Sequence, residues 1–162
     1  MRKFLIAAAL VVSASATATA EPYGAPRTIE AGGSAGLSVA TDSRDFNLTP
    51  QIGWFFAPDQ EISAIVSVTR VSSDMDTSTL FTALVEPSYH VALAPRFYGF
   101  FGLGVGGTWA PSVGGGVAIA PRLGANWPIG GSGVITPSVS WQYATLGVGS
   151  ALRLNLGYTV IW

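Results

Sequence analysis

The stretch that decides the fold runs from residue 152 to residue 162 and reads Leu152-Arg153-Leu154-Asn155-Leu156-Gly157-Tyr158-Thr159-Val160-Ile161-Trp162. Its even-numbered positions hold Leu, Leu, Leu, Tyr, Val and Trp, whereas its odd-numbered positions hold Arg, Asn, Gly and Thr, with Ile161 as the exception. Successive side chains of a β-strand point to opposite faces, so this alternation predicts a strand with one apolar and one polar face. The stretch also has the length of roughly 10 residues with which a tilted strand crosses a bilayer.

The same alternation recurs upstream, so the chain contains eight such segments in all. The other segments are residues 29–41, 46–56, 61–69, 81–93, 97–109, 117–129 and 135–143. Eight strands of about 10 residues, each with a turn, use about 18 residues apiece, which the chain provides once an N-terminal leader is set aside.

The composition is that of a membrane protein without transmembrane helices. Hydrophobic residues make up 49% of the chain, charged residues only 10%, and the mean hydropathy is +0.44. A soluble domain usually carries about 25% charged residues. Beyond the leader, however, no apolar run reaches the roughly 18 residues that a spanning helix needs. A closed barrel is the other architecture that satisfies its backbone in lipid, so the sequence predicts an all-β, eight-stranded antiparallel up-and-down transmembrane β-barrel.

The leader itself has the three parts of a secretory signal peptide. Met1-Arg2-Lys3 is basic, the stretch from Phe4 to Val12 is apolar but too short to span a bilayer, and Ala18-Thr19-Ala20 is a cleavage motif. We therefore expect residues 1–20 to be removed during export to the periplasm and residues 21–162 to form the barrel.

Charge and cysteine content exclude several kinds of site. Once Arg2 and Lys3 are removed, the remaining basic residues are all arginines, form no run and are outnumbered by acidic residues. This pattern lacks the electrostatic footprint of a nucleic-acid partner. The absence of cysteine excludes disulfides and thiolate metal sites. Asp74 and Asp76 supply only two carboxylates, which do not make a cation site. We expect neither a metal nor a cofactor.

Turns and aromatic residues predict the orientation. Turn-forming residues occupy 57–60, 94–96 and 130–133. With an even strand count these turns and both termini lie at one end, which is periplasmic in known barrels. The connections at the other end are also short, which argues against a large binding surface. Aromatic residues of the apolar face form two girdles near the expected bilayer interfaces. They are Trp54, Phe56, Tyr89, Phe97, Trp127, Tyr158 and Trp162 toward the periplasm, and Phe46, Phe81, Trp109, Trp141 and Tyr143 toward the outside.

Four prolines fit this scheme poorly. Pro50, Pro87, Pro121 and Pro137 lie inside predicted strands, where each removes a donor from the ladder. All four share the parity of the apolar face, and β-bulges could absorb the missing bonds. If the strands break there instead, a soluble exported β-sandwich becomes the alternative.

The signal peptide, the eight amphipathic segments and the terminal Tyr158-x-Val160-x-Trp162 together resemble the small outer-membrane barrels of the OmpA transmembrane-domain and OmpX-like group. The resemblance implies a monomeric, porin-like barrel in the outer membrane of a Gram-negative-type cell envelope, with outer-membrane lipid and lipopolysaccharide as its surroundings. It also implies that the last strand carries the signal read by the barrel-assembly machinery. The residues of that signal would be Leu154, Leu156, Tyr158, Val160 and Trp162.

The polar faces predict a side-chain-filled lumen, because an eight-stranded barrel leaves room for little else. The inward charged or titratable residues expected to form an ion-pair network are Glu30, Glu61, Glu86, His90, Arg122 and Arg153. Glu86 and Arg122 lie at similar depth, so we expect them to pair across the lumen, since buried charges need partners. Such a lumen is either a structural plug that serves envelope integrity or a narrow pore gated by this pair.

A lipid-modifying hydrolase is a further alternative. Glu86, Ser88 and His90 share one face and supply the parts of a Ser-His-acid set. Same-face neighbours in a strand lie about 6.8 Å apart, however, and three residues in one strand seldom converge. Their parity also points them into the lumen, away from lipid. The sequence therefore predicts no catalytic residue and no enzyme.

Overall fold

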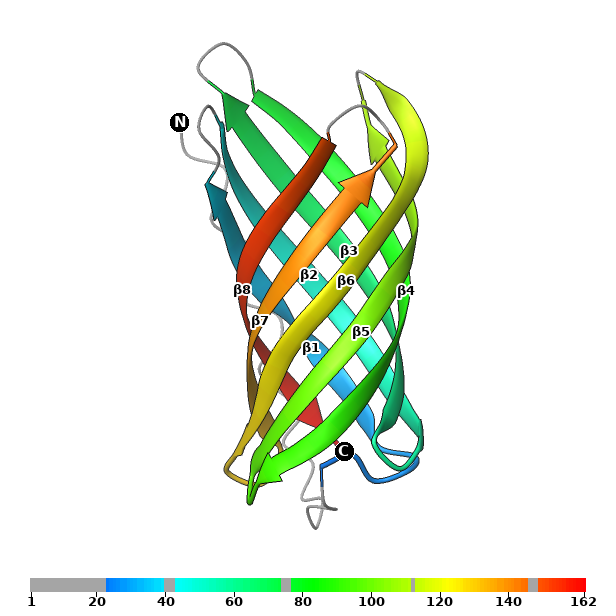
Figure 1. Ribbon diagram of the computed structural model, residues 1–162, viewed down its shortest axis with the longest axis vertical. Helices are drawn as coiled ribbons and strands as arrows, with labels where there is room; N and C mark the ends of the chain where they lie inside the picture. The colour runs from blue at the N-terminus through cyan, green and yellow to red at the C-terminus, as the bar shows by residue number, and fades with distance from the viewer. Residues whose placement is uncertain (1–22, 40–42, 74–76, 112, 146–148) are drawn as a thin grey trace.

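The strands close into a single ring. The computed structural model describes residues 23–39, 43–73, 77–111, 113–145 and 149–162. Its eight strands pair antiparallel in chain order, and the last pairs with the first (Figure 1). They are β1 (Ile29–Val39), β2 (Ser43–Ala57), β3 (Gln60–Ser73), β4 (Thr77–Ala94), β5 (Phe97–Ala110), β6 (Gly114–Ile129), β7 (Gly133–Ala144) and β8 (Gly149–Ile161). The predicted barrel is confirmed. The β-sandwich alternative is wrong, because two packed sheets would have edge strands and this ring has none.

The turns at 57–60, 94–96 and 130–133 form where they were expected. Each contains a residue with a positive φ, namely Asp59 at 59°, Arg96 at 64° and Gly130 at 63°. This left-handed conformation lets the chain reverse within a few residues. The predicted signal peptide at residues 1–20 and the pair Asp74 and Asp76 lie outside the described residues. No helix in the described part of the chain is long and apolar enough to cross a membrane.

Burial in this molecule is inverted relative to a soluble protein. In β4 exposed and buried residues alternate, with Val85 on the outside at 53% exposure and Glu86 on the inside at 1%. The outward positions are largely Leu, Ile, Val, Phe and Trp, whereas most buried side chains are polar. Apolar residues inside the barrel form only two small clusters, one of which comprises Ile65, Leu84, Ala118 and Ala120. Such a surface requires an apolar medium around it.

Both aromatic girdles lie on the outside of the barrel. Every member named from the sequence is exposed, and several stack with neighbours. Phe81 and Trp109, for example, are register partners with ring centroids 5.7 Å apart. The C-terminal residues Leu154, Leu156, Tyr158 and Trp162 are also exposed, and Val160 is partly buried.

The seam of the barrel is closed by β1 and β8. The Ile29 amide donates to the Trp162 carbonyl at 2.9 Å, and the Trp162 amide donates back at 3.1 Å. Trp162 therefore takes part in the pairing that joins the two ends of the sheet.

The prolines are accommodated without the expected bulges. Each proline is exposed and keeps its pairing with one neighbouring strand. In the ladder to the other neighbour, two consecutive residue pairs are missing at the proline. The pairs retained are Pro50 with Gly33, Pro87 with Ile62, Pro121 with Leu103 and Pro137 with Leu156. The same register resumes beyond each gap, and the register shifts lie elsewhere, at Phe55/Ala57 and Ala92/Ala94. A residue in an antiparallel ladder bonds to one neighbour only, so a proline costs one bond and leaves the other ladder intact.

Candidate functional site

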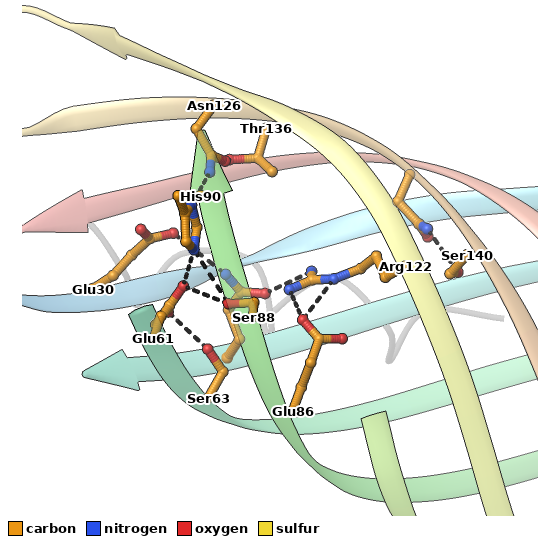
Figure 2. A network of polar contacts seen from close by, with 12 residues as sticks. Glu30, Glu61, Ser63, Glu86, Ser88, His90, Arg122, Asn126, Thr136 and Ser140 are labelled. Atoms are coloured by element: carbon orange, nitrogen blue, oxygen red, sulfur yellow. Dashed lines mark hydrogen bonds and ion pairs between the residues drawn. The ribbon is translucent and has the colours of Figure 1, made fainter. Parts of the chain in front are cut away.

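A buried ion pair crosses the middle of the lumen. The Arg122 guanidinium donates to Glu86 Oε1 from Nε at 3.0 Å and from Nη2 at 2.5 Å, and Nη1 donates to Gln51 Oε1 at 3.1 Å (Figure 2). Its Cζ lies 5.0 Å from the centroid of the Phe100 ring. The guanidinium thus connects β6 with β4 and β2 across the barrel, as expected for the Glu86–Arg122 pair.

A glycine makes room for this pair. A Cβ placed on Gly102 would lie 2.7 Å from the Glu86 carboxyl group, and one on Gly104 would lie 3.0 Å from Leu84. A Cβ at Gly102 would therefore displace the Glu86 carboxyl group from the place where it binds Arg122. The inward glycines of β5 therefore accommodate β4 side chains. Glu86 packs against Gly102 in addition to pairing with Arg122.

A second cluster surrounds His90, nearer the end of the barrel at which β4 turns into β5. His90 Nε2 lies 3.0 Å from Glu61 Oε2 and 3.2 Å from Ser88 Oγ. The Ser63 hydroxyl donates to Glu61 Oε1 at 2.7 Å. His90 Nδ1 lies 3.0 Å from Asn126 Nδ2. The acid that meets His90 is therefore Glu61 of the neighbouring strand, and Glu86 belongs to the other cluster.

The directions of these hydrogen bonds indicate which ring nitrogen of His90 carries the proton. Thr136 donates to Asn126 Oδ1 at 2.8 Å, so the Asn126 amide nitrogen is the atom that faces His90. An amide nitrogen only donates, so Nδ1 accepts and the ring proton resides on Nε2, where it is donated to Glu61. Ser88 in turn donates to Glu61 at 3.3 Å.

This arrangement differs from a catalytic triad. In a triad the acid binds one ring nitrogen of histidine and the serine binds the other, so that a free nitrogen can take the serine proton. Here Ser88 and Glu61 share Nε2, which already carries a proton. The Ser-His-acid alternative therefore lacks a base for Ser88.

Tyr23 is buried inside the barrel beside His90, and the strand pattern does not single it out. Its ring lies 5.5 Å from that of Phe55 and 4.9 Å from that of Tyr98, measured between centroids. Its hydroxyl donates to Glu30 Oε2 at 3.1 Å and lies 3.3 Å from His90 Nδ1. The only sequence signal was an aromatic residue just before the first strand, which the strand pattern did not use.

Backbone bonds hold the segment that carries Tyr23 against the barrel mouth. Arg27 donates to the Phe55 carbonyl at 2.7 Å, Phe55 donates to the Thr28 carbonyl at 2.9 Å, and Asp59 donates to the Gly24 carbonyl at 3.0 Å. We call residues 23–28 the N-terminal strap. Tyr23 of the strap contacts His90, and the Glu86–Arg122 pair lies beyond the His90 cluster along β4.

Arg153 was predicted to belong to the ion-pair network, but it forms no ion pair with a carboxylate in the described part of the chain. Its Nη1 donates to Gln142 Oε1, and its Nε has no hydrogen-bond partner. Arg153 lines a cavity of about 50 Å³ on the outer side of the Glu86–Arg122 pair, together with Asn47, Ser140 and Asn155. The structure thus divides the predicted single network into separate groups. No group of three or more His, Cys, Asp or Glu side chains among the described residues is arranged to hold a metal.

Comparison with known proteins identifies the architecture. No known protein family matches the sequence, and no curated protein matches it. Among solved structures, the outer membrane protein OprG from Pseudomonas aeruginosa matches with 14% identity and a TM-score of 0.61, over 86% of this chain and 97% of that chain. The N-terminal β-barrel domain of Pseudomonas aeruginosa OprF gives 14% and 0.62, over 85% and 98%. The fold is that of the small outer-membrane β-barrels.

The likeness extends to designed proteins of the same architecture. A de novo designed transmembrane β-barrel matches with 9% identity and a TM-score of 0.60, over 87% of this chain and 99% of that chain. Natural and designed barrels fit about equally well, so the likeness shows the fold and carries no particular role.

Tyr23 provides a prediction about alkaline pH. Burial raises the pKa of its hydroxyl well above the ordinary value, and the charges of Glu30 and Glu61 raise it further. The folded protein thus holds this proton more tightly than the unfolded chain, whose tyrosines titrate near pH 10. We expect its contribution to stability to be complete below about pH 10 and to be lost as the pH rises beyond that value. Urea unfolding of vesicle-embedded protein from pH 8 to pH 12 measures this loss.

The matched control for that prediction is Tyr23→Phe, which has no proton to lose. Its free energy of unfolding should fall less above pH 10 than that of the wild type. Equal losses in the two proteins would show that the alkaline transition does not arise from Tyr23.

Proposed function

We propose that this protein is a non-enzymatic, monomeric β-barrel integral to a bacterial outer membrane, with a plugged lumen and a structural role in envelope integrity. The observation that carries the proposal is the inverted burial, with large apolar side chains outside and buried polar side chains within. Outward residues such as Leu123 at 65% exposure would be unfavourable in water at this density. The aromatic girdles lie where the two bilayer interfaces would be.

Three groups of bonded side chains in the lumen support the plug. They are the Glu86–Arg122 pair, the His90 cluster, and Tyr23 with Glu30. A passage would require the bonds in all three groups to rearrange. In support of a non-enzymatic role, the Ser88 hydroxyl lacks a base and is buried in the lumen, away from lipid substrates.

We further propose that β8 is the strand recognised by the barrel-assembly machinery during biogenesis. Leu154, Leu156, Tyr158 and Trp162 are exposed on its outer face. Until the barrel closes, β8 also has a free edge, because its pairing with β1 forms last in chain order.

A gated narrow pore is the second candidate. The cavity of about 50 Å³ favours it, because Glu86 and Arg122 line this cavity and a passage could widen from it. Planar-bilayer recordings distinguish the two functions. A plug gives no steady single-channel conductance, whereas a pore conducts and its conductance changes in Glu86→Ala.

The membrane location and closure are tested by fractionation and gel mobility. We expect the protein in the outer-membrane fraction and a faster-migrating band in unboiled samples, because an edgeless ring of backbone hydrogen bonds resists detergent until heated. A soluble periplasmic protein with the same mobility before and after boiling would contradict the proposed function.

A further inference from the structure

Among the charged strand residues whose side chains the structure describes, Arg70 is the one that faces outward. Among strand residues whose side chains the structure describes, Glu30, Glu61, Glu86, Arg122 and Arg153 point inward. Arg70 of β3 has the outward parity of Val66 and Val68 and is exposed. Its outward neighbours along the strand, Val66 and Val68, are apolar and exposed.

The register places Arg70 at the outer aromatic girdle. It is paired with Phe46 of β2 and with Thr79 of β4. Its same-face predecessor Val68 is paired with Phe81, so Arg70 lies one step of about 6.8 Å beyond that girdle residue. This end of the barrel is opposite the end at which the C-terminus lies (Figure 1).

Arg70 has no ion-pair or hydrogen-bond partner among the described side chains. A charge on the lipid face of a barrel is strongly destabilising at the bilayer midplane and nearly neutral close to the interface. An arginine at the girdle therefore costs the barrel little stability. Its guanidinium is available to bind an anion in the headgroup layer.

We propose that Arg70 binds a phosphate of lipid A in the outer leaflet, with the acyl chains lying along the apolar face below it. A guanidinium binds phosphate in a bidentate manner and remains charged at all relevant pH values. Phe46 and Phe81 flank this position with the apolar surface that an acyl chain covers. The proposal rests on the proposed outer-membrane location and adds to it a specific headgroup contact at one end of the barrel.

The test uses detergent-folded full-length protein titrated with diphosphoryl lipid A and followed by native mass spectrometry. We expect Arg70→Gln to weaken binding about tenfold, the equivalent of about 1.4 kcal/mol for a lost charge-assisted hydrogen-bonded contact. Arg96→Gln is the matched control, because Arg96 is an exposed arginine in the turn at the opposite end of the barrel. It should bind lipid A as the wild type does.

The alternative outcomes separate the two proposals. Unchanged lipid A binding in Arg70→Gln would overturn the site. Equal binding of dioleoyl-phosphatidylglycerol, with the same dependence on Arg70, would overturn the choice of lipid A in favour of any anionic phosphate lipid. Each variant is also run boiled and unboiled. If the wild type itself shows no heat-dependent shift, the barrel proposal fails independently of Arg70.

Discussion

Glu86→Ala is expected to lower the free energy of unfolding by about 3 kcal/mol. Removing one partner of a buried ion pair costs about 3 to 5 kcal/mol, because the other charge remains buried and uncompensated. We expect the lower end of this range, since Arg122 keeps its bond to Gln51 at 3.1 Å and lines a cavity. Urea unfolding in lipid vesicles, followed by tryptophan fluorescence, measures the change.

Two further variants show whether the loss arises from the charge. Ser88→Ala is the next inward residue of the same strand and loses only a hydroxyl, so it should cost about 1 kcal/mol. Glu86→Leu combined with Arg122→Met removes both charges at similar volume and should recover most of the stability. If the double variant is as unstable as Glu86→Ala, the residue acts through packing against Gly102 and not through its charge.

Tyr23→Ala is expected to cost about 3 kcal/mol, the low end of the range for removing a buried aromatic side chain. The ring fills the space between Phe55 and Tyr98, and the hydroxyl is a partner of buried Glu30. Tyr23→Phe keeps the ring and should lose about 1 kcal/mol for the hydrogen bond. The same unfolding experiment measures both variants.

The control for this prediction lies in the same strap. Pro26 is exposed, so Pro26→Ala should change stability by no more than about 0.5 kcal/mol. Should Tyr23→Ala unfold at the wild-type urea concentration, the strap would not be docked on the barrel in the membrane.

The alternation of side chains was sufficient to predict the barrel, because period 2 carries both the strand and its two faces. Leu154 and Arg153 show this most simply, one exposed and one buried as their parity requires. The prolines fitted the prediction poorly because a lost ladder donor normally argues against a paired strand. In an antiparallel ladder it removes a bond on one side only.

The contacts inside the lumen were predicted less completely. They join side chains of different strands, and which side chains lie at the same depth depends on the register of strand pairing. Glu86 and Arg122 both lie near mid-strand, so small errors in register left their pairing intact. The partner of His90 was not foreseen, since Glu61 lies on the neighbouring strand and meets His90 through backbone pairing. Arg153 was assigned to the network by parity alone, and parity says nothing of the distance to a carboxylate.

Tyr23 and Phe55 were missed for a related reason. Phe55 lies beside a register shift at the end of β2, and its ring is fully buried although its neighbours Trp54 and Phe56 are exposed. At Phe55 the alternation cannot be recognised, because three consecutive residues are aromatic. Tyr23 lies outside any strand, so the alternation does not predict which way its side chain points. Side chains that seal the end of a barrel therefore carry little sequence signal.

The outward prolines have a consequence for the chain before it reaches the membrane. An exported strand such as β4 or β7 is apolar on one face and rich in β-forming residues, which is the signature of a segment that aggregates in water. A proline cannot donate to a stacked cross-β ladder, so Pro87 and Pro137 interrupt intermolecular stacking as gatekeepers. The finished barrel loses single ladder bonds to them, and the unfolded chain in transit gains solubility from the same residues.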